Sequence, residues 1–261
     1  MAYFSRTKLL PEPSHILCVH PASVDRFMNG CMKRLGRCDH HVAQAIRKCI
    51  EKEPADSVTF LDIGANIGSH AFYIASLGTP VLAVEPHPKD HSLLQSSFLL
   101  NRLSDVNFRL LPFALSDARG QIEMSNAPLN IGDAFLRVAG VSDTANRQLT
   151  PIVVVTRVLL DDLQAFVHTK SVVMKVDVQR HECHVVNGGL AFLANVNVPC
   201  VVMEWTDDRL KTDSVDRLCN EKMITEMSRL GYTARTLDGT SLFDLTAPVA
   251  YPGWTDFVWM K

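Results

Sequence analysis

The residues VTFLDIGANIGSH, at positions 58–70, decide the fold. The apolar run 58–64 ends in glycine, and such a run is typical of a strand buried on both faces of a sheet. Gly64 permits a sharp turn, and residues 69–77 then form a short helix that Gly78 ends. A strand, a glycine turn and a helix in this order predict the first βα unit of an α/β domain.

Outward from this unit, strand and helix patterns alternate along the chain. The helices have the length of crossover connections, which favours βαβ units in a doubly wound, mostly parallel sheet. Ligands of such sheets bind at the carboxyl ends of the strands. Strands are predicted at 80–86, 108–116, 120–126, 151–158, 171–178 and 199–205, with TARTL and DFVWM closing the sheet, and helices at 88–103, 160–167, 182–193 and 215–230.

The N-terminal part of the chain shows a weaker pattern. Residues 1–38 have no clear period and are predicted to form an irregular arm. A helix is predicted over 39–52, with Asp39 as its N-cap. We therefore divide the chain into an N-terminal arm and helix, residues 1–55, and a single domain, residues 56–261.

Composition and charge restrict the class of partner. The chain has 261 residues and a formal charge of −2, from 26 Lys+Arg and 28 Asp+Glu. Nucleic-acid-binding proteins usually carry a basic excess or a basic stripe, so no nucleic-acid partner is expected. We find no signal peptide and no run of about 18 apolar residues that would span a bilayer. These features predict a cytoplasmic protein without a membrane segment.

The cysteines give a second indication of the compartment. Seven cysteines, an odd number with no CxxC pair, argue against a disulfide framework and against a zinc ribbon. Reduced, buried thiols are the favoured interpretation, and a disulfide within the N-terminal group stays open for a chain that enters an oxidising compartment. The N-terminal group comprises Cys18, Cys31, Cys38 and Cys49, and the others are Cys183, Cys200 and Cys219.

The tip of the first strand indicates the charge of the ligand. Asp62 places a carboxylate there, which repels phosphate and attracts an ammonium or sulfonium group. Gly64 and Gly68 give the spacing G-x-x-x-G, whereas the loops that approach a pyrophosphate closely have G-x-G-x-x-G. The loop therefore favours a cationic amino-acid ligand over a dinucleotide.

The tip of the second strand adds another carboxylate. Glu85 follows Asp62 by 23 positions. An acidic residue about 20 positions on accepts hydrogen bonds from ribose hydroxyls, in NAD sites as in other nucleoside sites. Each feature alone is common in a plain strand–turn–helix or a solvated turn. On two consecutive βα units, the two together favour a nucleoside site.

These motifs resemble class I S-adenosylmethionine-dependent methyltransferases, and residues 56–260 resemble the FkbM family of these enzymes. The matching segments are Asp62 to Gly68, Glu85 to Pro88, Asn101, Ala114 to Asp117 with Gly120, Leu160 to Leu163, and Lys175 to Glu182. The resemblance implies a Rossmann-like, seven-stranded methyltransferase fold with S-adenosylmethionine as cofactor. It also implies O-methylation of a small molecule or a glycan.

The resemblance further implies which residues bind the cofactor. These are Asp62, Gly64, Asn66, Gly68 and Glu85, with Ser116 and Asp117 beside the adenine. Without the resemblance, the segment after Ser116 would be interpreted as a tight polar turn. The chain departs from the family at Gln179 and Arg180, where the family has Glu-Gly, and this change lies next to the expected reaction centre.

Two residues are predicted to act in catalysis. Asp177 lies at the tip of the strand beside the first one and is expected to face the reacting atoms, which methyl transfer must hold in line. His181 is a candidate base because a neutral imidazole is available near pH 7, the alternative being a histidine in a solvent-facing loop or first helical turn. Lys175 either pairs with Glu204 or acts in catalysis. The acidic residues here, Asp207 included, form no recognisable metal motif, and no metal is predicted.

Three functions remain open at this point. The first is an active O-methyltransferase. The second is a methyltransferase-like protein that binds the cofactor with weak or no turnover, as the Gln179–Arg180 departure suggests. The third is an NAD-dependent oxidoreductase, which the absence of G-x-G-x-x-G disfavours. Residues 127–149, predicted to be a long loop, and the N-terminal arm are expected to shape the acceptor pocket.

Overall fold

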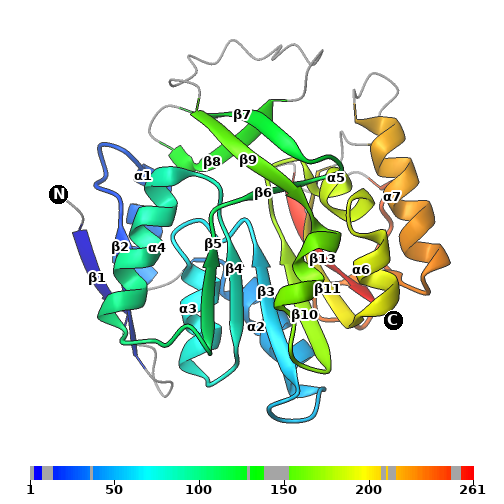
Figure 1. Cartoon of the computed structure of the whole chain (residues 1–261), viewed down its shortest axis with the longest axis horizontal. Helices are drawn as coiled ribbons and strands as arrows, with labels where there is room; N and C mark the ends of the chain where they lie inside the picture. Colours follow the sequence, from blue (N-terminus) through cyan, green and yellow to red (C-terminus); the bar gives the residue numbers. More distant parts are fainter. Residues whose placement is uncertain are drawn as a thin grey trace.

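A seven-stranded sheet forms the centre of the molecule, seen here in a computed structural model (Figure 1). The order is β12-β13-β11-β10-β3-β4-β5, and β13 alone runs against its neighbours. The predicted fold class, a doubly wound and mostly parallel sheet, is confirmed. The strands are β3 (Val58–Ile63), β4 (Val81–Val84), β5 (Phe108–Leu111), β10 (Ser171–Val176), β11 (Asn197–Thr206), β12 (Thr233–Thr236) and β13 (Trp254–Met260). The structure describes residues 3–7, 14–35, 38–127, 130–137, 153–206, 210, 216–247 and 254–261.

Helices cover both faces of this sheet, as the apolar character of its strands requires. Every residue of β3, β4 and β10 is buried, so both faces need a partner layer. One face packs against α2 (His40–Glu51), α3 (Ser69–Ser76) and α4 (Pro88–Leu100). The other packs against the 3-10 helix η1 (Leu160–Phe166), α5 (Glu182–Asn187), α6 (Leu190–Asn195) and α7 (Arg217–Arg229).

A second, four-stranded sheet lies at the end of the main sheet where β5 leads into β6 (Figure 1). Its strands are β6 (Ala114–Ser116), β7 (Gly120–Ala127), β8 (Asn130–Arg137) and β9 (Val153–Leu159), in the order β6-β9-β7-β8. The prediction of one strand over 108–116 was wrong, because Pro112 lacks an N–H and the chain changes sheet there. The loop predicted over 127–149 was wrong at β8, while 138–149 lie outside the described residues.

The N-terminal residues were also predicted wrongly. They form β1 (Tyr3–Thr7), β2 (His15–Val19) and α1 (Arg26–Leu35) rather than an irregular arm. The Asn101 side chain bonds both backbone groups of Ile16, at 2.8 and 2.7 Å, and so fixes β2 beside the end of α4. Asp39 does precede α2 as its cap residue, but its side chain makes no capping hydrogen bond. Tertiary contacts stabilise these elements, which is why their local pattern is weak.

A glycine pair divides the helix that was predicted over 182–193. The helix ends at Gly188 and α6 begins after Gly189. A Cβ on Gly188 would lie 2.0 Å from the carbonyl oxygen of Ser116, and one on Gly189 would lie 2.4 Å from a Leu160 methyl carbon. The missing side chains therefore allow the segment to approach β6 and η1 closely.

Three disulfides correct the prediction of reduced thiols. They join Cys31 to Cys38, Cys49 to Cys200 and Cys183 to Cys219, and Cys18 is the one free, buried cysteine. The spacing of the cysteines could not reveal the last two pairs, because 151 and 36 residues separate their partners. The bridge between Cys49 and Cys200 fastens α2 to β11 of the main sheet.

Thiol titration tests these bridges. In denaturant without reductant, we expect Ellman's reagent to detect one thiol per chain, that of Cys18, because the other six are blocked. After reduction the same assay is expected to detect all seven cysteines of the sequence. Seven thiols before reduction, in protein purified under oxidising conditions, would contradict the three bridges.

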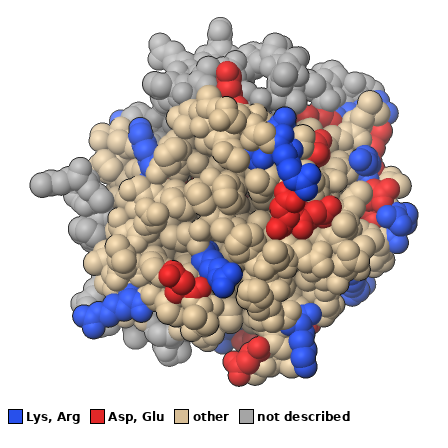
Figure 2. All heavy atoms as spheres, viewed as in Figure 1, with Lys and Arg blue, Asp and Glu red and all other residues tan. Residues whose placement is uncertain are grey.

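Charges are mixed over the surface. Figure 2 shows acidic and basic side chains interspersed on the face that Figure 1 presents. Among the residues that the structure describes, no helix combines the length and the apolar composition needed to cross a bilayer. The next question is what the polar residues at the carboxyl edge of the main sheet can bind.

Candidate functional site

Buried carboxylates lie at the carboxyl ends of β3 and β4, the edge that the sequence indicated. Asp62 is 0% exposed and Glu85 is 6% exposed. Asp62 lies opposite Ala83 of β4 on one side and Lys175 of β10 on the other. The structure therefore brings Asp62 and Glu85 to neighbouring strand tips, on either side of the loop that links β3 to α3.

Glycines let this loop pack tightly. Gly64 has φ +78°, and a Cβ there would lie 1.9 Å from the carbonyl oxygen of Asp177. Gly68 has φ +89°, and a Cβ there would lie 2.6 to 2.7 Å from side-chain carbons of Leu94 and Phe72. Any other residue at these two positions would displace the loop from β10 and α4. The glycines thus hold the loop tightly against the neighbouring elements of the protein.

Glu85 connects the loop with the second strand tip. Its Oε2 accepts the Asn66 N–H at 2.8 Å and its Oε1 accepts the His87 N–H at 2.7 Å. Asn66 adopts a left-handed φ of 53°, which turns its N–H toward the carboxylate. Burial raises the pKa of Glu85, and the nearby Asp90 carboxylate raises it further. Each carboxylate oxygen keeps a second lone pair, so Glu85 can still accept from a ligand.

Lys175 is the counter-ion of this edge. Its Nζ lies 3.3 Å from Asp177 Oδ2 and 3.7 Å from Asp62 Oδ1. Lys175 is thus paired with two aspartates, partners that the sequence interpretation did not consider for it. Burial raises the pKa of Asp62 to about 6, although Lys175 opposes the rise. One lysine therefore compensates two carboxylates only in part.

Asp177 is fixed through both of its oxygens. Lys175 holds Oδ2, and the Gln179 side-chain amide donates to Oδ1 at 3.0 Å. A glutamate at position 179, as in the family pattern, has no hydrogen to donate and would repel Asp177. Gln179 and Arg180 both have left-handed φ values, 54° and 76°, so Arg180 keeps the backbone shape that a glycine would adopt more easily.

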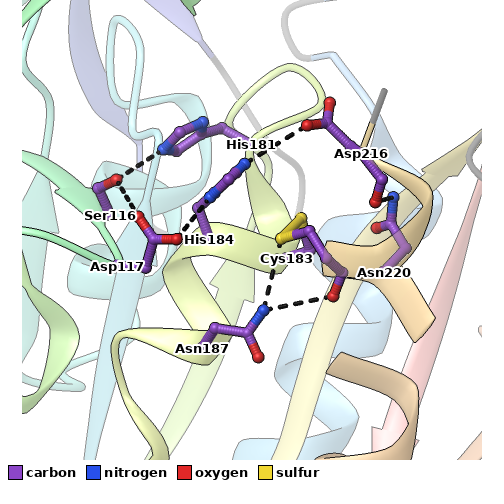
Figure 3. Close-up of a disulfide and its surroundings, with 9 residues drawn as sticks. Ser116, Asp117, His181, Cys183, His184, Asn187, Asp216 and Asn220 are labelled. Atoms are coloured by element: carbon purple, nitrogen blue, oxygen red, sulfur yellow. Dashed lines mark hydrogen bonds and ion pairs between the residues drawn. A yellow bond between two sulfur atoms is a disulfide. The ribbon is translucent and has the colours of Figure 1, made fainter. Parts of the chain in front are cut away.

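A histidine network surrounds the predicted adenine-binding residues (Figure 3). Ser116 is fully buried, and its hydroxyl lies 2.9 Å from His181 Nε2. The Asp117 carboxylate lies 2.9 Å from His184 Nδ1, and the rings of His181 and His184 stack at 4.3 Å. Burial tends to raise the pKa of Asp117, but the bond and charge of His184 hold it below its ordinary value.

His181 is the cap residue that directly precedes the first turn of α5. It is 3% exposed, so it lies in no solvent-facing loop. Burial, assisted by the charge of His184, lowers the pKa of His181 to about 3, so its ring is neutral and weakly basic. Its hydrogen bond with Ser116 favours a positioning role for His181 over that of a base.

Sequence reasoning missed His184 and Asp216, which complete this network. His184 Nε2 lies 3.5 Å from Asp216 Oδ1, on the side away from Asp117. Burial tends to lower the pKa of His184, but the two aspartates raise it above its ordinary value. No local signal marks this contact, since Asp117 and His184 lie 67 positions apart.

Among the residues that the structure describes, two groups of side chains have distances that suit a metal ion. The potential ligand atoms of each group lie within 4.8 Å of one another. In the group of Asp177, Glu182 and Glu204, Glu182 already accepts the Val178 N–H at 3.1 Å. In the group of Cys183, His184 and Cys219, the two cysteines form a disulfide. Asp207 lies outside the described residues, and the absence of a metal stays a prediction.

Comparisons with solved structures give low similarity over most of the chain. A precorrin-6y methyltransferase from Geobacter metallireducens is 11% identical with a TM-score of 0.41, covering 84% of this chain and 86% of that one. A TehB-like SAM-dependent methyltransferase from Corynebacterium glutamicum is 14% identical at 0.45, covering 90% and 94%. A putative O-methyltransferase from Klebsiella pneumoniae is 12% identical at 0.40, covering 90% and 95%. A search of curated proteins finds no match.

A family model decides the classification. The model described as the methyltransferase FkbM domain matches residues 62–233, about two thirds of the chain. This match includes every residue that was predicted to bind the cofactor, and both predicted catalytic residues. It confirms the resemblance noted in the sequence, and with it S-adenosylmethionine as the cofactor of the domain. The chain belongs to the family of FkbM methyltransferase domains.

Proposed function

We propose that this protein transfers the methyl group of S-adenosylmethionine to a hydroxyl group of a small molecule or a glycan. The observation that carries the proposal is the pair of buried, incompletely compensated carboxylates, Asp62 and Glu85, on neighbouring strand tips. Their raised pKa values mean that burial without a ligand disfavours the charged forms. A bound sulfonium or ammonium group would compensate these charges, so the donor set fits the cofactor.

Each predicted binding residue has a role in this proposal. Glu85 accepts from the ribose hydroxyls with the lone pairs that Asn66 and His87 leave free. Asp62 supplies negative charge under the cationic part of the cofactor, and the backbone of the 64–68 loop borders it. Ser116 and Asp117 lie beside the adenine, and the hydrogen bonds from His181 and His184 orient them.

The chain's own residues position the acceptor. The cofactor supplies a methyl group that its positively charged sulfur activates. Asp177, fixed by Lys175 and Gln179, orients the acceptor and keeps negative charge beside the reaction. Holding the two reactants in line supplies much of the acceleration. The carboxylates at this edge also disfavour an anionic acceptor, which supports an uncharged hydroxyl compound over a nucleic acid.

One observation favours a second candidate, a cofactor-binding protein with weak turnover. Arg180 stands in a left-handed conformation where the family has glycine, and it adds an exposed cationic residue shortly after the tip of β10. Gln179 also replaces a carboxylate of the family pattern. The spacing of the loop disfavours the third function, that of an NAD-dependent oxidoreductase. The loop has G-x-x-x-G, whereas loops that bind a dinucleotide have G-x-G-x-x-G.

Incubation with methyl-labelled S-adenosylmethionine tests the proposal. The acceptors are a panel of sugars, phenols and aliphatic alcohols, with amines and carboxylic acids as the comparison. We expect label in an ether linkage on members of the hydroxyl panel. Label on amines or carboxylates alone would overturn O-methylation. Cofactor binding by calorimetry without transfer to any member would favour the second candidate.

The disulfides bear on the compartment. The sequence predicts the cytoplasm, where thiols are kept reduced. Three bridges in one chain are more typical of an oxidising compartment, so we infer that the protein works in one. Localisation of the tagged full-length protein, combined with the thiol titration, tests this inference, and a cytosolic protein with seven free thiols would refute it.

A further inference from the structure

A histidine and an aspartate from outside the family match lie at the same edge of the sheet as Asp177. His41 is in the first turn of α2 and Asp256 is in β13, whereas the match covers residues 62–233. Their side chains lie 3.2 Å apart, from His41 Nε2 to Asp256 Oδ2. These two residues are 215 positions apart, so only the fold brings them together.

The register of the strands places Asp256 on the same face as Lys175. Lys175 lies beside Val202, and Val202 lies opposite Val258. Because side chains alternate along a strand, Asp256 shares this face with Val258, two positions nearer the carboxyl edge of the parallel strands. The same face carries α2, whose apolar residues pack with Val202 and Val258.

The position of α2 is fixed by more than this packing. The bridge between Cys49 and Cys200 ties α2 to β11, the neighbour of β13. The start of α2, with Asp39 and His41, is therefore held at the end where the strand tips carry Asp177 and Glu204. Electrostatic coupling reflects this proximity, since Asp177, His41, Asp39 and Lys175 all act on the Asp256 carboxyl.

The two residues predicted to act in catalysis, Asp177 and His181, have positioning roles in this account. Asp177 is held at Oδ2 by Lys175 and at Oδ1 by Gln179, and it orients the acceptor. His181 is buried, and its Nε2 is occupied by Ser116. The His41 side chain, by contrast, is 64% exposed, and with its Nε2–H donating to Asp256 the Nδ1 lone pair can accept a proton.

We propose that His41, oriented by Asp256, is the base that removes the proton from the acceptor hydroxyl. The acceptor would then enter between the start of α2 and the carboxyl ends of β10 and β13. This inference rests on the proposed function, because it names the base and the acceptor side of the same site. It extends the site to two residues beyond those that the family resemblance implies.

The step balances in atoms and charge. The hydroxyl proton moves to Nδ1 of His41 as the hydroxyl oxygen forms its bond to the methyl carbon. The carbon–sulfur bond breaks and its electron pair stays on sulfur, which becomes neutral. The products are a methyl ether, a thioether and an imidazolium. Asp256 stabilises that imidazolium. Burial, and to a smaller extent the charge of Asp177, raises the pKa of Asp256 to about 6, so the Asp256 carboxylate is ionised above neutral pH.

An NMR comparison tests the placement without any acceptor. Histidine ring signals are recorded at one pH with S-adenosylhomocysteine bound, and again with sinefungin, which carries an amine in place of the methylated sulfur. The added positive charge should shift the ring signals of His41 between the two complexes if the ring faces the methyl position. His168, exposed before the amino end of β10, serves as the control and should not respond.

The outcomes distinguish a failure of the proposed function from a failure of the assignment of His41 as the base. If neither compound binds, the proposed function itself fails. If both bind and His41 responds no more than His168, the cofactor site stands and the assignment of the base is overturned. Asp256→Asn should change the ring signals of His41 in either complex, because it removes the charged partner of the ring. No change in this variant would likewise overturn the pair.

Kinetics with an acceptor from the hydroxyl panel complete the test. His41→Gln should lower kcat about 100-fold, with unchanged affinity for S-adenosylhomocysteine. Asp256→Asn should lower kcat less, because an orienting partner is lost and the base is kept. His40→Gln is the matched control at the neighbouring position, where the ring contacts Gln44 instead, and should retain wild-type turnover. Equal losses in the His40 and His41 variants would show a structural effect of the helix start and overturn the proposal.

Discussion

Replacing Glu85 with alanine is expected to weaken the binding of S-adenosylhomocysteine about 100- to 10,000-fold. A carboxylate that accepts from two ribose hydroxyls makes two charge-assisted hydrogen bonds, each contributing about 1.5–3 kcal/mol. The variant also loses the acceptor that turns the Asn66 and His87 N–H groups toward one point. Isothermal calorimetry on the wild type and the variant measures the change.

Two further variants make this result specific. Glu85→Gln keeps one acceptor oxygen and the shape of the side chain, so an intermediate loss is expected. Glu226→Ala, on helix α7 away from the strand tips, should leave the affinity unchanged. Wild-type affinity in the Glu85→Ala variant, with an unchanged melting temperature, would refute the assignment of Glu85 to the ribose.

Replacing Asp177 with asparagine is expected to lower methyl transfer about 100-fold while changing cofactor affinity far less. Asparagine keeps the shape but removes the charge that holds Lys175 at 3.3 Å, so the orientation of the acceptor is lost. Misplacement by about 1 Å is enough for a loss of this size. The measurement is kcat with the best hydroxyl acceptor, alongside the calorimetric affinity for S-adenosylhomocysteine.

Asp105→Asn, an exposed carboxylate after α4, is the matched control and should behave as the wild type. Gln179→Glu adds a second test of the same contact, since it restores the family residue and places a carboxylate beside Asp177. A loss of cofactor affinity as large as the loss of kcat in Asp177→Asn would mean that Asp177 belongs to the cofactor site instead.

The main sheet could be predicted because its signals are local. The run 58–64 and the segment 171–178 are apolar over the length of a strand, and glycines mark the turn after the first of them. The change of sheet at Pro112 was missed because the apolar run continues on both sides of it. Strand β8 was missed because its register with β7, and not its own sequence, makes it a strand.

The cofactor side of the site was easier to predict than the acceptor side. Asp62 and Glu85 belong to consecutive βα units, so topology alone brings them together. His41 and Asp256, by contrast, lie near opposite ends of the chain and meet only because β13 inserts beside β11. The disulfide partners Cys49 and Cys200 illustrate the same limit, since a spacing of 151 residues leaves no local pattern.

The central claim is that two buried carboxylates on neighbouring strand tips hold a positively charged nucleoside. A crystal structure of the protein soaked with S-adenosylmethionine tests it most directly. The account predicts both ribose hydroxyls within hydrogen-bond distance of Glu85, the sulfonium on the side of Asp62 and Asp177, and the adenine beside Asp117. A cofactor bound elsewhere, or a Glu85 carboxylate that turns to solvent while the ribose contacts other residues, would contradict it.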